Sequence, residues 1–242
     1  MARSIAPTSG TVPSTSAECW DAGARDFAAS MPAPLGEARV AGPTRLPVRP
    51  LEFDGSRIAR AVLRVCGWRV ACAGLPARQG VVIVYPHTSN WDFVWAMLAK
   101  WALGVPVTFW GKATLFRIPL MGRWLRWLGG IPVVRDAPSG VVGQMAQRLR
   151  EARERDEFMW LGLSPEGTRR LTPGWRSGFH QVALQADVPV VLAYLDYPRR
   201  EVGLESAWRL SGDARADLAC FAQRLQGRTG RRPSLAAPVR LL

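Results

Sequence analysis

His87 and Asp92 are the residues in this chain best suited to acid-base chemistry. They stand five positions apart, directly after an apolar run rich in Val and Ile. A neutral imidazole works as a general base near neutral pH when an adjacent carboxylate accepts its Nδ1 proton and so fixes its tautomer. No Gly-x-Ser-x-Gly nucleophile elbow occurs in the sequence. The pair therefore predicts a base that activates a hydroxyl group of the substrate itself.

Two further polar clusters also follow apolar runs, namely Gly111-Lys112 and Glu166-Gly167-Thr168-Arg169. The guanidinium of Arg169 is a planar fork suited to phosphate. Gly167 permits close backbone approach, Thr168 offers a hydroxyl, and Glu166 is placed to hold the arginine. On their own, Glu166 and Arg169 are more typical of a surface ion pair worth little. Beside the His-Asp pair, we interpret the cluster as a phosphate site.

Alternating strands and helices must position these clusters. Strands are predicted over residues 68–73, 81–85, 105–110, 131–135, 158–163 and 188–195, with a pair of short strands within 201–210. Helices are predicted over residues 56–66, 93–103, 120–128, 139–153, 178–186 and 213–226. This order indicates an α/β fold with a mixed, mainly parallel sheet flanked by helices. Because parallel strands end at one edge of a sheet, the three polar clusters are expected to converge there.

Composition divides the chain into three parts. Residues 1–50 are rich in Ala, Pro, Ser, Thr and Gly and lack a regular period, which predicts a disordered extension. Residues 51–228 form the folded domain, and residues 229–242 are expected to be a basic, frayed C-terminal tail. Nothing like a secretory segment opens the chain, and no apolar run reaches the ~18 residues of a spanning helix. We therefore expect a cytoplasmic protein that attaches to a membrane only peripherally.

The formal net charge of +13 indicates an anionic partner, such as nucleic acid, an acidic membrane surface or a phosphorylated substrate. Arginines share one face of the first predicted helix, and arginines and tryptophans alternate in the helix 120–128. These residues are Arg57, Arg60, Arg64, Arg123, Trp124, Arg126 and Trp127. In one interpretation the arginines are solvated and the tryptophans pack in the core. In the other, these side chains contact the anionic head groups of a membrane. The cysteines and histidines show no metal-ligand spacing, and no nucleic-acid motif occurs.

Four blocks, taken in order, resemble those of the glycerolipid acyltransferases of the lysophosphatidic-acid acyltransferase type. The segment His87-Thr-Ser-Asn-Trp-Asp92 is similar to the family's His-x4-Asp block. The other three blocks are similar to Gly111-Lys-Ala-Thr-Leu-Phe-Arg117 with Gly130-Ile-Pro-Val-Val-Arg135, to Pro165-Glu-Gly-Thr-Arg169, and to Val188-Pro-Val-Val191. With its flanking segments, the resemblance covers residues 56 to 226.

The resemblance implies a glycerol-phosphate acyltransferase-like fold and an O-acyltransferase activity. In this family His87 would be the base and Asp92 its orienter. The acceptor phosphate would be bound by Glu166, Gly167, Thr168 and Arg169, with Lys112 and Arg117 as further candidates. The donor would be acyl-CoA or acyl carrier protein, which is a substrate, so no cofactor and no metal are expected. The partners would be a lysophospholipid such as 1-acylglycerol-3-phosphate and the anionic lipids on the inner face of the cell membrane.

Two departures from the family pattern leave the acceptor open. Pro86 replaces the Asn often found before the histidine, and Ser164 replaces a large apolar residue. An acceptor without a phosphate, such as lyso-ornithine lipid, is the enzymatic alternative. The alternative from another class is a non-catalytic basic module that binds membranes or nucleic acid. His180, which lies on the helix after the third block, is expected to be a structural residue rather than a second base.

Overall fold

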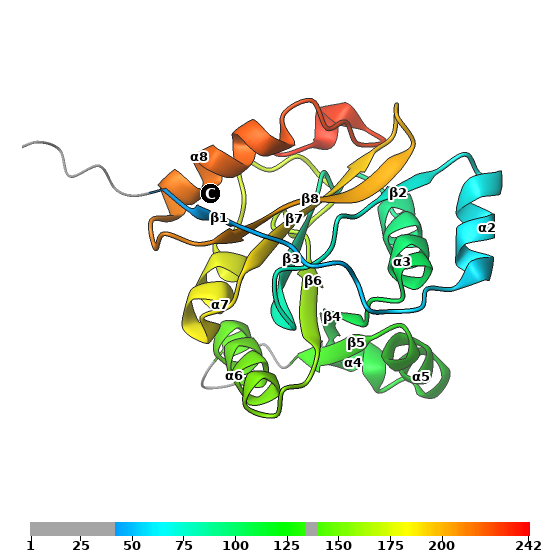
Figure 1. Ribbon diagram of the computed structural model, residues 1–242, viewed down its shortest axis with the longest axis horizontal. Coiled ribbons are helices and arrows are strands. Elements are labelled where there is room, and N and C mark those ends of the chain that lie inside the picture. The colour runs from blue at the N-terminus through cyan, green and yellow to red at the C-terminus, as the bar shows by residue number, and fades with distance from the viewer. Residues whose placement is uncertain (1–41, 134–139) are drawn as a thin grey trace, which may run out of the picture. The chain divides into compact units, whose positions relative to one another are not determined.

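The computed structural model describes residues 42–133 and 140–242 (Figure 1). Most of the predicted extension 1–50, Arg135 of the second block and the predicted helix cap Ser139 lie outside the described residues. Val40–Leu242 forms one compact unit. Of the predicted extension, the structure describes only residues 42–50.

An eight-stranded sheet forms the centre of this unit. Its strands are β1 (Thr44–Leu46), β2 (Arg69–Ala71), β3 (Gln79–Tyr85), β4 (Val107–Lys112), β5 (Gly130–Val133), β6 (Met159–Leu163), β7 (Val190–Asp196) and β8 (Glu201–Arg209). Their order is β1-β8-β7-β3-β6-β4-β5, and β2 also pairs with β8. The pairs along β7-β3-β6-β4-β5 are parallel, whereas β8 runs antiparallel to β7 and to β1. The predicted mixed, mainly parallel sheet is confirmed.

Helices cover both faces of the sheet. They are α2 (Arg57–Val65), α3 (Trp91–Leu103), α4 (Ala113–Phe116), α5 (Pro119–Trp127), α6 (Gly140–Glu154), α7 (Gly178–Ala186) and α8 (Ala214–Leu225), with a short 3-10 turn at Pro233–Leu235. The Ser56 hydroxyl accepts a hydrogen bond from the Ala59 backbone N–H at 3.2 Å and so caps α2, as its position before the helix predicts. The helices flanking the sheet in this way complete the predicted α/β architecture.

The central strand β3 is buried on both faces, which explains its unbroken apolar sequence. Val81 and Ile83 pack into the cluster formed with α6 and α7, whereas Val82 packs with Trp160 on the opposite face. Helices α2 and α3 cover that opposite face farther along β7 and β8, and Figure 1 shows the two helix groups on opposite sides of the sheet. The core therefore holds β3 rigidly, and with it the loop that follows.

Three sequence predictions need correction. Residues 44–46, predicted as part of a disordered extension, form β1, because the free edge of β8 pairs with them. The chain at 201–209 is one long strand rather than a pair of short strands. Residues 229–242 are not frayed: Ala237 is fully buried, and Leu241 bridges to Trp175. All three segments depend on distant partners, which local composition does not reveal.

Candidate active site

Three neighbouring strands deliver polar side chains to one edge of the sheet. His87 follows β3, Glu166 follows β6 and Tyr197 follows β7. Strand β3 lies between the other two and is parallel to both, with Ile83 opposite Leu163. The backbone N–H of His87 donates a hydrogen bond to Oε1 of Glu166 at 2.6 Å. The predicted meeting of the first and third polar clusters is therefore confirmed.

His87 and Asp92 are in direct contact, with Nδ1 of the imidazole 3.3 Å from Oδ2 of the carboxylate. Asp92 lies in the first turn of α3, where the helix dipole favours a negative charge. Its side chain is 1% exposed, whereas that of His87 is 24% exposed. Because Nδ1 faces the carboxylate, Nε2 is the nitrogen left for a substrate. This is the geometry that a general base needs.

Asp92 is held by four partners at once. The backbone N–H groups of Thr88 and Ser89 donate to Oδ2 at 2.7 and 2.8 Å. The Tyr197 hydroxyl donates to Oδ1 at 2.6 Å. Burial raises the pKa of this carboxyl, but the hydrogen bonds from His87, Tyr197, Ser89 and Thr88 outweigh burial and leave the pKa below its ordinary value. Asp92 is thus a charged and fixed partner for the imidazole.

Glu166 has a different role from the predicted one. It is fully buried, and its second oxygen, Oε2, accepts a hydrogen bond from the Ala237 backbone N–H at 3.1 Å. Burial raises the pKa of this carboxyl more than its hydrogen bonds lower it. The prediction that Glu166 holds Arg169 is wrong: the buried carboxylate bonds to the backbone N–H groups of His87 and Ala237, and among the described residues no ion pair joins it to the exposed Arg169 side chain. Glu166 instead fixes the backbone position of His87.

The last three residues of the third block, Gly167, Thr168 and Arg169, lie at the surface or near it. Gly167 has φ +67°, a left-handed conformation that a side chain would strain. The Thr168 hydroxyl accepts a hydrogen bond from the Arg170 backbone N–H at 3.3 Å. The Arg169 side chain is exposed, and within the described ranges no carboxylate forms an ion pair with it. Its guanidinium thus has capacity for an anion.

The second block is placed less completely. The backbone of Lys112 ends β4 at the same edge of the sheet, but its side chain lies outside the described part. Arg117 follows α4 and is exposed. Among the hydrogen bonds and ion pairs of the described residues, none joins Arg117 to the His-Asp pair. Both residues stay candidates without a demonstrated place at the dyad.

The sequence prediction missed Tyr197, which lies in a turn after β7. One signal could have found it, since β7 is a continuous apolar strand of the buried parallel type. The first polar residues after such a strand belong to the same edge as those after β3. In the structure Tyr85 of β3 lies opposite Tyr194 of β7, so the two chains leave the sheet side by side.

A second buried His-Asp pair lies away from these strand ends. Nε2 of His180 on α7 lies 2.7 Å from Oδ2 of Asp217 on α8, and both residues are almost fully enclosed. The Ser211 hydroxyl also donates to Asp217 at 2.7 Å. This cluster fastens the start of α8 to α7, which fits the structural role expected for His180.

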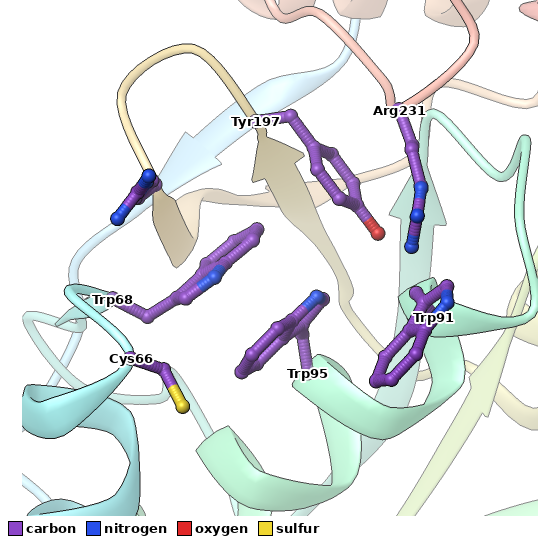
Figure 2. A pocket seen from close by; sticks show the side chains of 7 residues that line it. Cys66, Trp68, Trp91, Trp95, Tyr197 and Arg231 are labelled. Atoms are coloured by element: carbon purple, nitrogen blue, oxygen red, sulfur yellow. The ribbon is translucent and has the colours of Figure 1, made fainter.

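An aromatic pocket of about 360 Å³ adjoins the His-Asp pair (Figure 2). Trp68 and Trp95 stack in its wall with ring centres 4.6 Å apart, and Trp68 meets the Tyr197 ring edge-on at 5.1 Å. Trp91 lines the pocket as well, one helical turn before Trp95. Because Tyr197 both lines the pocket and bonds to Asp92, the pocket and the dyad share one side chain.

The site combines a half-buried histidine, oriented by a buried carboxylate, with an adjoining apolar pocket on an α/β sheet. A base placed in this way beside an apolar pocket is a combination suited to an enzyme active site. A family model described as Acyltransferase matches residues 69–195, more than half of the chain. The chain belongs to this acyltransferase family.

Two individual proteins are similar to the chain. The lysophospholipid acyltransferase LPEAT1 of Arabidopsis thaliana is 32% identical over 153 residues, which make up 61% of this chain and 36% of that protein. The chain therefore spans about a third of the length of this relative. The crystal structure of the 1-acyl-sn-glycerophosphate acyltransferase PlsC of Thermotoga maritima aligns over 60% of this chain and 63% of its own, with a TM-score of 0.41 and 17% identity.

Proposed function

We propose that this protein transfers a fatty acyl group from an acyl thioester to the hydroxyl group of a lysophospholipid. The observation that carries the proposal is the His87–Asp92 contact at the strand edge of a chain in the acyltransferase family. The thioester is that of CoA or of acyl carrier protein, and the acceptor is 1-acylglycerol-3-phosphate or a related lysolipid. The similarity to a lysophospholipid acyltransferase of Arabidopsis thaliana supports a lysophospholipid as acceptor.

The proposed chemistry needs one base and no protein nucleophile. The acceptor hydroxyl donates a hydrogen bond to Nε2 of His87, and its oxygen attacks the thioester carbonyl carbon while its proton moves to Nε2. Asp92 stabilises the imidazolium that forms. The tetrahedral intermediate then collapses, the C–S bond breaks, and the sulfur leaves with the proton held by His87. The products are the diacyl lipid and the free thiol.

The acceptor phosphate is assigned to the exposed end of the third block. Arg169 supplies the guanidinium, and Gly167 and Thr168 lie beside it in the same loop. Glu166 links this loop to the backbone of His87, so an anion bound at Arg169 lies on the loop that also positions the base. Lys112 and Arg117 are proposed as secondary contacts to the same phosphate.

We propose peripheral attachment to the inner face of the cell membrane through helices α2 to α5. Most of the large apolar side chains that the described residues expose lie on these helices and their junctions: Ile58, Val62, Val65, Trp91, Val94, Leu115, Ile118, Leu120, Met121, Trp124 and Trp127. Helix α3 packs on α2, and its Trp101 meets Trp127 of α5 at 5.4 Å, so these surfaces adjoin. None of the helices described is long and apolar enough to cross a bilayer.

Basic side chains accompany this apolar surface. Arg57, Arg60 and Arg64 are exposed on α2, and Arg123 and Arg126 are exposed on α5. Exposed tryptophans next to arginines favour the interface of an anionic membrane over burial in a core. The pocket opens beside exposed Trp91, so a lysolipid in the membrane surface lies close to its entrance.

A substrate panel tests the proposed function. The purified protein is incubated with acyl-CoA or acyl carrier protein thioesters and with lysophosphatidate, other lysophospholipids, lyso-ornithine lipid or monoacylglycerol, and the products are identified by mass. The proposal predicts a diacyl phospholipid and an equal amount of free thiol. Acylation of lyso-ornithine lipid alone would show that the acceptor is not a lysophospholipid. The absence of any acylated product would contradict the proposed acyltransferase activity.

A further inference from the structure

The C-terminal segment 230–237 is fastened to the active site at two points. The Arg232 backbone N–H donates a hydrogen bond to the Thr88 hydroxyl at 3.2 Å, and the Ala237 N–H bonds to Glu166. Gly230 packs so closely that a Cβ there would lie 2.7 Å from the Thr88 hydroxyl oxygen. The segment lies beyond residues 69–195, which the family model matches. This segment is therefore a built part of this chain's site that the family blocks do not include.

Arg231 is placed over the aromatic pocket by these contacts. Its guanidinium carbon lies 5.4 Å from the centre of the Trp91 ring, and Figure 2 shows the side chain reaching toward Trp91 beside Tyr197. Burial and the hydrogen bond to Asp92 raise the pKa of Tyr197, and the positive charge of Arg231 lowers it by a smaller amount. Arg231 thus lies within electrostatic reach of the residue that bonds to Asp92.

The charge of Arg231 is available to a ligand, unlike that of its neighbour Arg228. The Arg228 guanidinium lies within 3.7 Å of the Glu201 and Asp196 carboxylates and 3.5 Å from the Tyr194 ring centre. Among the described residues no carboxylate forms an ion pair with Arg231, which is exposed. A guanidinium held at a pocket without a counter-ion favours an anionic ligand.

The lining of the pocket next to Arg231 indicates which chemical groups the ligand carries besides its anionic group. Its volume of about 360 Å³ lies in the ordinary range of small-molecule sites. Its wall is mainly three indole rings and a phenol ring, which favour an apolar chain. A ligand that suits this pocket has a hydrocarbon part against the aromatic rings and an anionic group at Arg231. A single-chain lysophospholipid has both, and it also carries the hydroxyl group that the proposed reaction requires.

We propose that Arg231 binds the phosphate of the lysophospholipid acceptor at the mouth of this pocket, with the acceptor's chain against Trp68 and Trp95. The proposal rests on the proposed function, and it adds a second guanidinium to that of Arg169. The C-terminal segment is then part of the acceptor site, through both its backbone and this side chain.

Arg231→Gln tests the proposal against a matched control. Arg224 also places its guanidinium over a tryptophan, 5.6 Å from the Trp208 ring centre, but on α8 and away from the pocket. A short-chain lysophosphatidate, kept monomeric, serves as the acceptor. The KM for this acceptor should rise about tenfold in Arg231→Gln and by a smaller factor in Arg231→Lys. In Arg224→Gln the same KM should stay near the wild-type value. The KM for the thioester should not change in Arg231→Gln.

Binding measured without turnover separates this proposal from the proposed function. Quenching of tryptophan fluorescence by the same lysophosphatidate is titrated in the wild type and both glutamine variants. Weaker binding in Arg231→Gln alone supports the site even if the wild type transfers no acyl group. Equal binding and equal KM in Arg231→Gln and Arg224→Gln would overturn the role of Arg231, whether or not the wild type is active.

Discussion

The Tyr197 hydroxyl donates a 2.6 Å hydrogen bond to Oδ1 of Asp92 and leaves Oδ2 to face the imidazole of His87. This bond joins the loop after β7 to the first turn of α3. It anchors Oδ1, while Oδ2, which accepts hydrogen bonds from the Thr88 and Ser89 backbone N–H groups, faces the imidazole. The position of His87 relative to a substrate therefore depends on a residue 110 positions away in the sequence.

Tyr197→Phe should lower kcat about tenfold while leaving the KM of the thioester unchanged. The variant keeps the ring in the pocket wall but leaves Oδ1 of Asp92 without its donor, and a hydrogen bond to a charged group is worth about 1.5–3 kcal/mol. Steady-state kinetics and thermal unfolding of both proteins measure the effect. A wild-type kcat in a folded Tyr197→Phe protein would show that this bond does not serve catalysis.

Arg169→Gln should raise the KM for a phosphate-bearing lysolipid about tenfold and change kcat less. The reason is the loss of a charge-assisted contact to the acceptor, made by a side chain without an ion-pair partner in the described part of the structure. Acceptor titrations at saturating thioester measure it, with Arg170→Gln as the neighbouring exposed control. Equal acceptor KM values in the two variants would favour an acceptor without phosphate.

Asp92 should make stability depend on pH in the acid range. Its pKa in the folded protein lies below that of an unfolded aspartate, about 3.9, so the stability it contributes is present above that value and is lost as the pH falls through the folded pKa. The free energy of unfolding in urea is measured between pH 7 and pH 3 for the wild type and Asp92→Asn. The difference between the two should shrink toward the acid end.

The comparison with Asp92→Asn also separates the contribution of Glu166. The folded pKa of Glu166 is raised, so its contribution has the opposite sign and fades as the pH rises through that pKa. Burial, the main cause of the raised Glu166 pKa, is the same in both proteins, so most of its contribution cancels in their difference, and only the smaller part due to the Asp92 charge is lost in Asp92→Asn. A difference between the two proteins that stays constant from pH 7 to pH 3 would contradict the charged state assigned to Asp92.

The contacts of the site that could be predicted from the sequence are those between residues close in sequence or at the ends of neighbouring parallel strands. The contact between His87 and Asp92 is local, since a strand end, a short loop and one helical turn bring them together. The meeting of His87 with Glu166 needs only the rule that parallel strands share an edge. Both relationships could therefore be predicted from the sequence. The function of Glu166 could not, because its partner Ala237 lies on a segment without a regular pattern.

The parts of the fold that were not predicted also depend on contacts with segments distant in the sequence. Strand β1 is three residues long and exists because the edge of β8 accepts it, and the segment 229–242 is ordered by contacts to Thr88, Glu166 and Trp175. Neither carries a period of its own. The tryptophans of α5 show the reverse case: Trp124 and Trp127 are 50% and 69% exposed, which excludes the core packing that their type favours.

Leu120→Glu should weaken binding to anionic vesicles at least tenfold. Leu120 on α5 is 82% exposed, and burying such a side chain in a lipid surface is worth about 1.5–3 kcal/mol, to which the new negative charge adds repulsion. Co-sedimentation with phosphatidylglycerol vesicles measures it. Leu184→Glu on α7, exposed but outside the α2 to α5 surface, is the control. If both variants bind like the wild type, this surface does not contact the membrane.

The most direct test of the proposed function is acyl transfer by His87→Ala, compared with Asn90→Ala. Asn90 lies in the same loop, is exposed and makes no side-chain capping bond, so its removal leaves the dyad in place. Release of free thiol from the acyl thioester with a lysophospholipid is followed for both folded proteins. We predict a rate at least about 100-fold lower in His87→Ala and near wild type in Asn90→Ala. Transfer at the wild-type rate by folded His87→Ala would contradict the role of His87 as the base.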